Sequence, residues 1–253
     1  MNGQLISSFL RHRVPIIVAL LAVFLPSHES IGADNKTAEC SKDLMLVFDA
    51  SGSMATTDTA RKEPHLERVK RALHRILPEI PSSRRMGLII YGEGAYNKCD
   101  AIELKVRPQL NAGPLIVSEV DKVRPTGRTP LTQSVRDAAD VLNYRHNPSV
   151  IVLLTDGEET CGGKPCDVAP MLRSEALDLT IHVIGYRHAN AAGLGDVFSA
   201  RCLAAETGGL YLPVESEDEL TEALRKTLTC PLTASLPTGP SHVKKAEISS
   251  PSR

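Results

Sequence analysis

The sequence lacks several features that would indicate a particular class of function. Its 29 Lys and Arg residues nearly balance 30 Asp and Glu, which leaves a formal net charge of −1 at pH 7. This balance gives no reason to expect nucleic acid or an acidic membrane as a partner. Trp is absent, aromatic residues make up only 4% of the chain, and no internal repeat is present. The rest of the composition, 42% apolar and 23% charged, is ordinary for a soluble globular protein.

The chain also lacks an N-terminal apolar run of membrane-spanning length. The run at residues 14–25 is well short of the ~20 residues that a transmembrane helix needs. Arg11 and Arg13 precede it, and small residues at 30–33 follow it. This order is typical of a secretory signal peptide, and we expect residues 1–33 to be removed by cleavage after Ala33. The protein would then be secreted or periplasmic, with no membrane contact beyond the signal sequence; an uncleaved anchor is the alternative.

The catalytic motifs of several enzyme classes are missing. The sequence contains no Gly-x-Ser-x-Gly elbow, no Gly-rich phosphate-binding loop and no His-Glu-x-x-His helix. Asp49 and Asp156 each follow an apolar run that reads as a strand. In this respect the sequence resembles the metal-dependent phosphatases of the haloacid-dehalogenase type. Those enzymes need a second acid two residues after the first, where this chain has Ser51, which cannot act as a general acid at neutral pH. We therefore expect a protein that is not an enzyme, with a metal-dependent hydrolase or phosphatase as one alternative.

Apolar runs and amphipathic stretches alternate along the chain. Helices are predicted at 63–80, 114–123, about 130–144, about 194–207 and 217–228, and buried strands at 44–48, 86–91, 150–154 and 179–186. Residues 101–106 read as an edge strand of a hairpin, and Pro213 places the strand at 210–214 at a sheet edge. The alternation predicts an α/β fold with a doubly wound, mostly parallel central sheet and helices on both faces. One domain is expected at 34–230, followed by a disordered tail at 231–253.

Oxygen-bearing side chains follow two of the predicted buried strands. The strand at 44–48 ends in Asp49, Ser51 and Ser53, and the strand at 150–154 is followed by Asp156. Open α/β sheets bind ligands at the carboxyl ends of their strands. An oxygen-only set suits Mg²⁺, Ca²⁺ or Mn²⁺ and suits zinc poorly. The alternative is a plain set of helix caps and turns.

A third loop, ahead of a predicted helix, carries Thr129. This residue is predicted as an N-cap with Pro130 at the first helical position. His65 and His74 have no acid or Cys at metal-binding spacing on their helix, and we expect both at the surface.

At these residues the sequence resembles the von Willebrand factor A (integrin I-like) family, over about residues 42–229. The resemblance rests on Asp49-Ala50-Ser51-Gly52-Ser53, on Thr129 within residues 127–131 and on Asp156 within residues 154–157. Residues 155–163 further resemble a bacterial branch of the family. The resemblance implies a Rossmann-like sheet with a metal-ion-dependent adhesion site.

The roles of the site residues follow from this resemblance. Ser51, Ser53 and Thr129 would bind Mg²⁺ (or Ca²⁺ or Mn²⁺) directly, while Asp49 and Asp156 would act mostly through waters. The under-neutralised cation would capture an Asp or Glu carboxylate of a protein partner. Residues 54–57 stand where integrin β-type domains carry an acidic pair, so a second adjacent metal is not expected. A domain whose ion only stabilises the fold is a further alternative. We expect Arg128, Glu158 and Glu159 to be solvated loop residues.

The six cysteines behind a signal sequence favour disulfides, because the even count suits an oxidising compartment. A zinc site is the alternative for Cys161 and Cys166, but no second close pair completes it. On the implied fold the two ends of the domain meet, which suggests a Cys40–Cys230 bridge. The other four cysteines fall near the metal-bearing edge, and two pairings stay open there: Cys161–Cys166 with Cys99–Cys202, or Cys166–Cys202 with Cys99–Cys161.

Overall fold

The structure, a computed structural model, describes residues 42–57, 62–186 and 200–229. These residues form a sheet with the strand order β3-β2-β1-β4-β5-β6. All neighbouring strands are parallel except β2 and β3, which are antiparallel. The strands are β1 (Asp43–Asp49), β2 (Met86–Tyr91), β3 (Ile102–Gln109), β4 (Ser149–Thr155), β5 (Leu179–Tyr186) and β6 (Tyr211–Val214).

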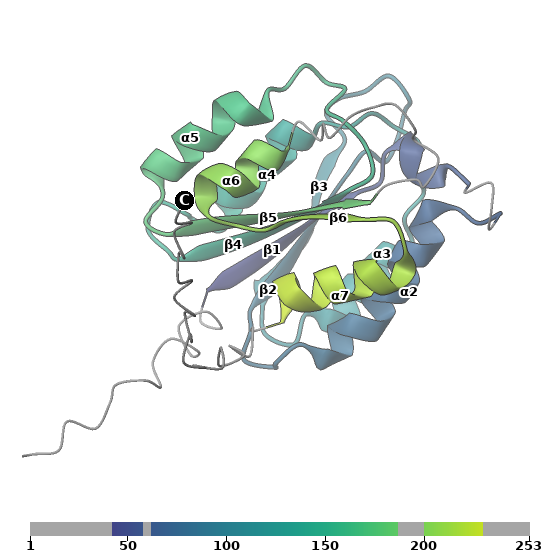
Figure 1. Ribbon diagram of the computed structural model, residues 1–253, viewed down its shortest axis with the longest axis horizontal. Helices are drawn as coiled ribbons and strands as arrows, with labels where there is room; N and C mark the ends of the chain where they lie inside the picture. Colours follow the sequence, from purple (N-terminus) through teal and green to yellow (C-terminus); the bar gives the residue numbers. More distant parts are fainter. Residues whose placement is uncertain (1–41, 58–61, 187–199, 230–253) are drawn as a thin grey trace, which may run out of the picture. The chain divides into compact units, whose positions relative to one another are not determined.

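Helices cover both faces of this sheet (Figure 1). One face carries α2 (His65–Ile76), α3 (Gly113–Asp121) and α7 (Glu217–Leu228). The opposite face carries α4 (Leu131–Val141), α5 (Pro165–Glu175) and α6 (Arg201–Thr207). Two short 3₁₀ helices, η1 (Gly52–Ala55) and η2 (Leu77–Glu79), lie after β1 and after α2. The predicted doubly wound α/β fold with one antiparallel edge strand is confirmed.

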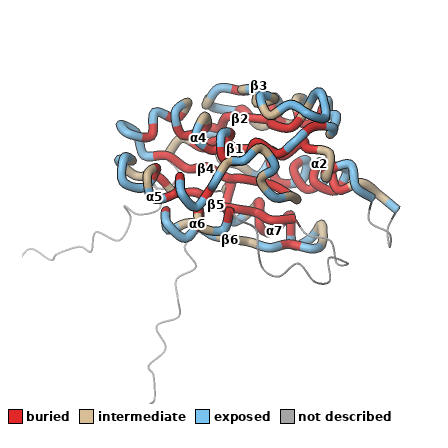
Figure 2. The backbone as a smooth tube through the Cα atoms, turned by 90° about the horizontal axis from the view of Figure 1, so that it is seen from above, coloured by how far each residue is buried: buried red, intermediate tan, exposed pale blue. Residues whose placement is uncertain are grey.

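The central strand β1 shows why its sequence is apolar without interruption. Leu46 and Phe48 pack among the helices of one face, and Met45 and Val47 pack among those of the other. All four side chains have no exposed surface, and the strands form the buried centre in Figure 2. A strand buried on both faces has no polar alternation, which is the pattern that predicts it.

The order in which the chain adds strands to the sheet changes side between β1 and β4. After β1 the chain adds β2 and β3 on one side, and it then returns to place β4 on the other side of β1. Phe48 lies opposite Leu154 in the register, so Asp49 and Thr155 end the two strands side by side. Such a switch point, at the carboxyl ends of parallel strands, is where open α/β sheets bind ligands.

Several predicted element boundaries are confirmed and have local causes. Helix α7 begins after a capping box in which the Ser216 hydroxyl accepts from the Glu219 N–H at 3.2 Å and the Glu219 carboxylate reaches back. Helix α6 ends at Gly208, whose φ of 71° is a left-handed conformation that glycine adopts easily. Strand β6 lies at the sheet edge, as Pro213 predicts.

Two expectations about helices are wrong. No helix is predicted at residues 165–175, where α5 forms; Pro165 opens this helix, a position that suits proline, and Pro170 lies inside it. Thr129 is not the N-cap of α4: the cap position is Pro130, and no side chain caps the helix.

The remaining expectations concern parts of the chain that lie outside the described residues. They are the signal peptide at 1–33, the tail at 231–253, the Cys40–Cys230 bridge and the first part of the helix expected from about 194. Among the described helices, none is both long and apolar enough to cross a membrane.

Candidate metal-binding site

Asp49 stands at the end of β1 with both carboxylate oxygens held by neighbours. The Ser51 N–H donates to Oδ1 at 2.8 Å, and the Thr155 hydroxyl, at the end of β4, donates to Oδ2 at 2.5 Å. The residue has no exposed surface. The pairing of β1 with β4 therefore fixes the orientation of this carboxylate.

The two serines after Asp49 connect it to the second acid. The hydroxyls of Ser51 and Ser53 lie 3.0 Å apart, and the Ser53 hydroxyl donates to Asp156 Oδ1 at 2.5 Å. Asp156 follows Thr155 directly, so the turns after β1 and β4 contribute to one cluster. The cluster contains four of the five residues that the sequence singles out.

The loop that carries Thr129 is attached to the same place through its backbone. The Gly52 N–H donates to the Gly127 carbonyl at 3.0 Å, and the Gly127 N–H donates to the Gly92 carbonyl at 2.7 Å. A Cβ at position 127 would lie 2.7 Å from that Gly92 oxygen, so only glycine allows this approach. Three loops thus meet with little room between their backbones.

Thr129 itself is buried and faces the cluster across Gly157. A Cβ at position 157 would lie 3.2 Å from the Ser53 hydroxyl oxygen and 3.9 Å from that of Thr129. The two hydroxyls therefore border the same small space, which the missing side chain of Gly157 leaves open. The structure brings all five candidate residues together: Asp49, Ser51, Ser53, Thr129 and Asp156.

The electrostatics of this cluster suit a cation. Burial, and next the nearby charge of Asp156, raise the pKa of Asp49 from 3.8 to about 6. A divalent ion beside Asp49 would offset the effect of the Asp156 charge on this carboxylate. Within the described parts of the chain, no three His, Cys, Asp or Glu side chains gather into a metal-binding group. An ion held here would therefore depend on hydroxyl oxygens, which favours Mg²⁺, Ca²⁺ or Mn²⁺ over zinc.

His65 lies beside this cluster and not at the surface, so that expectation is wrong. Its side chain is 1% exposed, and Nδ1 lies 2.8 Å from Asp156 Oδ2. His65 is the first residue of α2. No spacing pattern could reveal this contact, because the partners are 91 positions apart. His74, on the same helix, is half exposed as expected.

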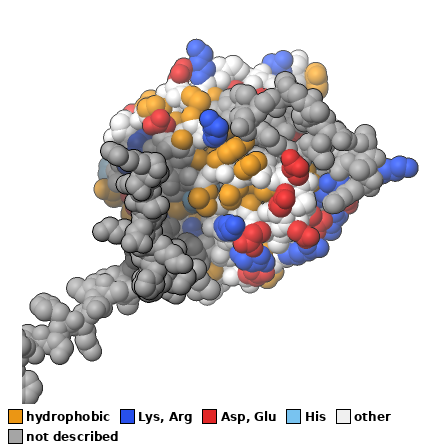
Figure 3. Space-filling model, viewed as in Figure 1, with side chains coloured by type: hydrophobic (Ala, Val, Ile, Leu, Met, Phe, Trp, Pro, Cys, Tyr) orange, Lys and Arg blue, Asp and Glu red, His pale blue; other side chains and the backbone are white. Residues whose placement is uncertain are grey.

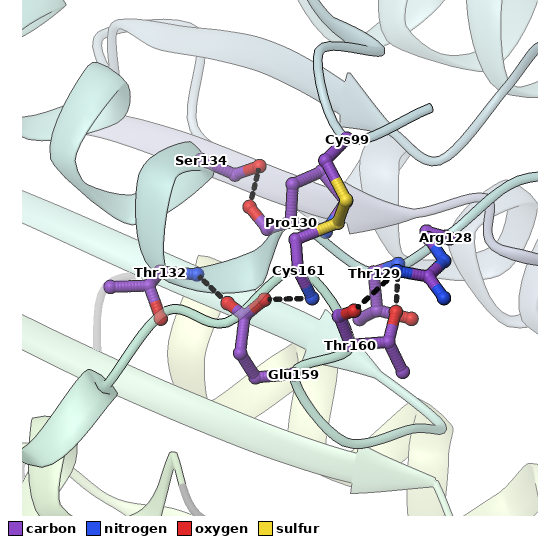
Figure 4. The surroundings of a disulfide bond; sticks show 9 residues. All are labelled: Cys99, Arg128, Thr129, Pro130, Thr132, Ser134, Glu159, Thr160 and Cys161. Atoms are coloured by element: carbon purple, nitrogen blue, oxygen red, sulfur yellow. Dashed lines mark hydrogen bonds between the residues drawn. A yellow bond between two sulfur atoms is a disulfide. The ribbon is translucent and has the colours of Figure 1, made fainter. Parts of the chain in front are cut away.

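Glu159 is also not a free solvated residue, as Figure 4 shows. Its carboxylate accepts from the Thr132 N–H at 2.8 Å, near the start of α4, and from the Cys161 N–H at 2.7 Å. Next to it, the Thr160 hydroxyl accepts from the Thr129 N–H at 2.8 Å. These bonds join the loop after β4 to the loop that carries Thr129. Glu158 is exposed, as expected.

Arg128, the neighbour of Thr129, is exposed as expected and donates to the Thr160 carbonyl at 3.1 Å.

Disulfides connect the segments around the candidate site. Of the two open pairings, the structure has Cys99–Cys161 together with Cys166–Cys202. The pairing of Cys161 with Cys166 is therefore wrong.

Comparisons with known proteins agree with this geometry. Residues 44–159 match the model of the von Willebrand factor type A domain family. The uncharacterized protein YwmD of Bacillus subtilis is 26% identical over 219 residues, which cover 83% of this chain and 93% of YwmD.

Two solved structures share the fold. The von Willebrand factor type A protein of Catenulispora acidiphila is 16% identical with a TM-score of 0.54, over 74% of this chain and 42% of that one. Proximal thread matrix protein 1 from the mussel byssus, solved with a zinc-occupied MIDAS motif, is 20% identical with a TM-score of 0.53, over 75% of this chain and 46% of that one. The chain thus spans less than half of either solved chain. Residues 44–159 therefore match the von Willebrand factor type A domain family, and the described residues share the fold of a solved protein of that type.

Proposed function

We propose that the protein is a non-enzymatic binding module. It holds a divalent cation, preferably Mg²⁺, at Asp49, Ser51, Ser53, Thr129 and Asp156, and uses this cation to capture an Asp or Glu carboxylate of a protein partner. The observation that supports it most is the meeting of two buried acids and three hydroxyls from three loops at one switch point.

The charge of the donor set explains why a partner carboxylate would bind. Three neutral hydroxyls contact the ion directly, while the two acids act mostly through waters, so the cation keeps part of its charge. A site with an exchangeable water position then favours an incoming anion. The zinc-occupied motif in the mussel byssus protein supports metal binding on this fold. The oxygen-only donors of this chain support Mg²⁺ in preference to zinc.

Secretion or export to a periplasm is part of the proposal. The N-terminal pattern supports a signal peptide at 1–33, with a domain at 34–230 and a tail at 231–253. The two disulfides among the described cysteines also favour an oxidising compartment.

A hydrolase finds little support at this site. The position that a phosphatase of the haloacid-dehalogenase type would use for its general acid is Ser51, whose hydroxyl lies 3.0 Å from that of Ser53. A hydroxyl does not protonate a leaving group at neutral pH. The other alternative, an ion that only stabilises the fold, differs from the proposal in one respect: its ion would not accept an external carboxylate.

The metal can be tested by calorimetric titration of Mg²⁺ into the purified protein. We compare the wild type with Asp49→Asn, which keeps the shape of the side chain, and with Asp218→Asn at a side chain that is 99% exposed. The wild type and Asp218→Asn should bind the ion, and Asp49→Asn should not. A wild type that binds neither Mg²⁺ nor Mn²⁺ contradicts the proposal.

Capture of a carboxylate can be tested with bound Mn²⁺ as the probe. Water-proton relaxation reports the waters on the ion, and acetate should lower the relaxation enhancement by displacing one of them. Acetamide, which has the same shape without the charge, serves as the control. An enhancement that acetate leaves unchanged would indicate an ion that only stabilises the fold.

A further inference from the structure

We infer that His65 is a positioning residue of the metal site: the imidazole holds the Asp156 carboxylate so that one of its oxygens faces the hydroxyl cluster. The inference rests on the proposed function, because it concerns how tightly the same site holds its cation. It assigns a role to a side chain that is not among the five proposed ligands.

The contacts of Asp156 divide its two oxygens between different partners. Oδ1 accepts from the Ser53 hydroxyl at 2.5 Å, and Oδ2 lies 2.8 Å from His65 Nδ1. An ionised carboxylate can only accept, so the inference requires the tautomer in which Nδ1 carries the proton and donates. The side chain of Asp156 has no exposed surface. Water therefore does not compete for the oxygen that faces His65.

The ring of His65 is itself held in place from the other side. It meets the ring of Tyr186, at the end of β5, edge to face, with centroids 5.0 Å apart and planes at 75°. The Tyr186 hydroxyl accepts from Arg68 Nη1 at 3.0 Å, and Arg68 lies one turn after His65 on α2. The imidazole is thus held between the sheet and its own helix.

This arrangement reduces the freedom of the carboxylate in the metal-free protein. Without the imidazole, Asp156 could rotate and exchange its two oxygens, and the cation would have to order it on binding. Outer partners that orient a ligand typically change metal affinity about 10–100-fold when they are removed. We expect an effect of this size from His65, although it would not contact the ion.

The test compares three variants in a calorimetric titration with Mg²⁺ and with Mn²⁺. His65→Phe keeps the aromatic ring against Tyr186 but removes the donor, and it should weaken binding by about 10-fold or more. His65→Asn places an amide N–H near the position of Nδ1 and should recover most of the affinity. His74→Phe, on the same helix but half exposed, is the matched control and should bind like the wild type.

Recovery of affinity by His65→Asn separates positioning from a merely structural role. A structural role would lower the unfolding temperature in chelator for both variants without restoring affinity in the Asn form. Equal affinity of His65→Phe and wild type overturns the inference and leaves the proposed function intact. A wild type that binds no ion overturns both.

A measurement on the wild type covers the case in which His65→Phe does not fold. Long-range ¹⁵N–¹H spectra of the histidine rings report which nitrogen carries the proton. We expect a protonated Nδ1 on His65, protected from exchange with water. A bare Nδ1 would overturn the inference, because the ring could then not donate to Asp156.

Discussion

The buried carboxylate of Asp49 would favour cation binding, but in its ionised form it lowers the stability of the fold. Its pKa in the folded protein is about 6 and its ordinary value is 3.8, so the fold favours the protonated form. The ionised form therefore costs stability at neutral pH, and this cost grows as the pH rises from about 4 to about 6. A cation would offset the cost by binding only the folded state.

We predict that Asp49→Asn stabilises the metal-free protein while it removes metal binding. In chelator at pH 7.5 the free energy of unfolding should rise by about 1–3 kcal/mol, because one pKa unit corresponds to about 1.4 kcal/mol. The gain should shrink as the pH falls toward 4, where Asp49 is protonated in both states. Denaturant unfolding at both pH values measures it. An Asn variant less stable than the wild type at pH 7.5 contradicts the electrostatic argument.

Gly157 supplies a second prediction at this scale. A methyl group at this position would come within 3.2 Å of the Ser53 hydroxyl oxygen and would enter the space that Thr129 also borders. Gly157→Ala should therefore weaken Mg²⁺ binding by about 10-fold or more, with the calorimetric titration as the measurement. The backbone there is not in the positive-φ region, so unfolding in chelator should change little. Unchanged affinity would mean that the ion does not use this space.

The five proposed ligands could be predicted from the sequence because each stands next to a strong local pattern. Asp49 ends one apolar strand and Asp156 directly follows another, while Thr129 lies two residues after Gly127 and directly before Pro130, ahead of a helix. His65 and Glu159 carry no such pattern, since their partners are 91 and 27 positions away. Contacts of this kind depend on how helices and loops pack, and periodicity does not report that packing.

At the scale of elements, prediction succeeded where one signal dominated. Strand β5 and helix α7 have the predicted bounds, because one is a buried apolar run and the other starts with a capping box. Helix α5 was missed; Pro170 inside it argues locally against a helix that tertiary packing nevertheless stabilises. Its buried residues Val168, Ala169 and Leu172 supply that packing.

The sequence of β6 disfavours pairing between this outer edge of the sheet and a strand of another chain. Figure 3 shows hydrophobic side chains gathered on the face where β6 lies in front, and Leu210 next to the strand is 43% exposed. Pro213 lies opposite Gly185 and has no N–H to offer to a further strand. An edge strand this short with an internal proline is a poor template for pairing with another chain.

A hydrogen bond between two titratable side chains joins the ends of α4 and α5. The Tyr144 hydroxyl, just after α4, donates to Glu175 Oε2 at 2.6 Å, at the end of α5. This bond, and next the Arg145 guanidinium, lower the pKa of Glu175. Burial, and next Glu175, raise the pKa of Tyr144 to about 12. The bond needs a protonated Tyr144 and an ionised Glu175.

We predict that Tyr144→Phe destabilises the protein most between about pH 5 and pH 10. The lowered pKa of Glu175 means that its stabilisation is complete above the ordinary value of 4.5 and fades as the pH falls. The raised pKa of Tyr144 means that its contribution is complete below 10 and is lost as the pH rises through about 12. Denaturant unfolding of both proteins across this range measures the difference. A difference that does not depend on pH would show that only packing is lost.

At the scale of the whole molecule, disulfides close long segments of chain near the candidate metal site. Cys99–Cys161 closes 62 positions and Cys166–Cys202 closes 36. By the chain-entropy model each restricts the unfolded chain and contributes about 4 kcal/mol. Replacing Cys99 and Cys161 together by Ser should lower the free energy of unfolding by about this amount. Denaturant unfolding under oxidising conditions measures it, and reductant should then destabilise this variant less than it destabilises the wild type.

The position of β1 between β2 and β4 has a consequence for the order in which the molecule folds. Strand β2 follows β1 closely in the chain, but β4 arrives only after β3, α3 and α4. The hydrogen bonds that join Asp49 to Thr155 and Ser53 to Asp156 span 106 and 103 positions. Such distant contacts form slowly, since a long loop must close before they are made. A chain that has folded only as far as β2 has Asp49 in place but not Asp156, and it would not hold the cation. A bound ion would therefore mark molecules whose folding is finished, and unfinished ones would have nothing with which to hold a partner.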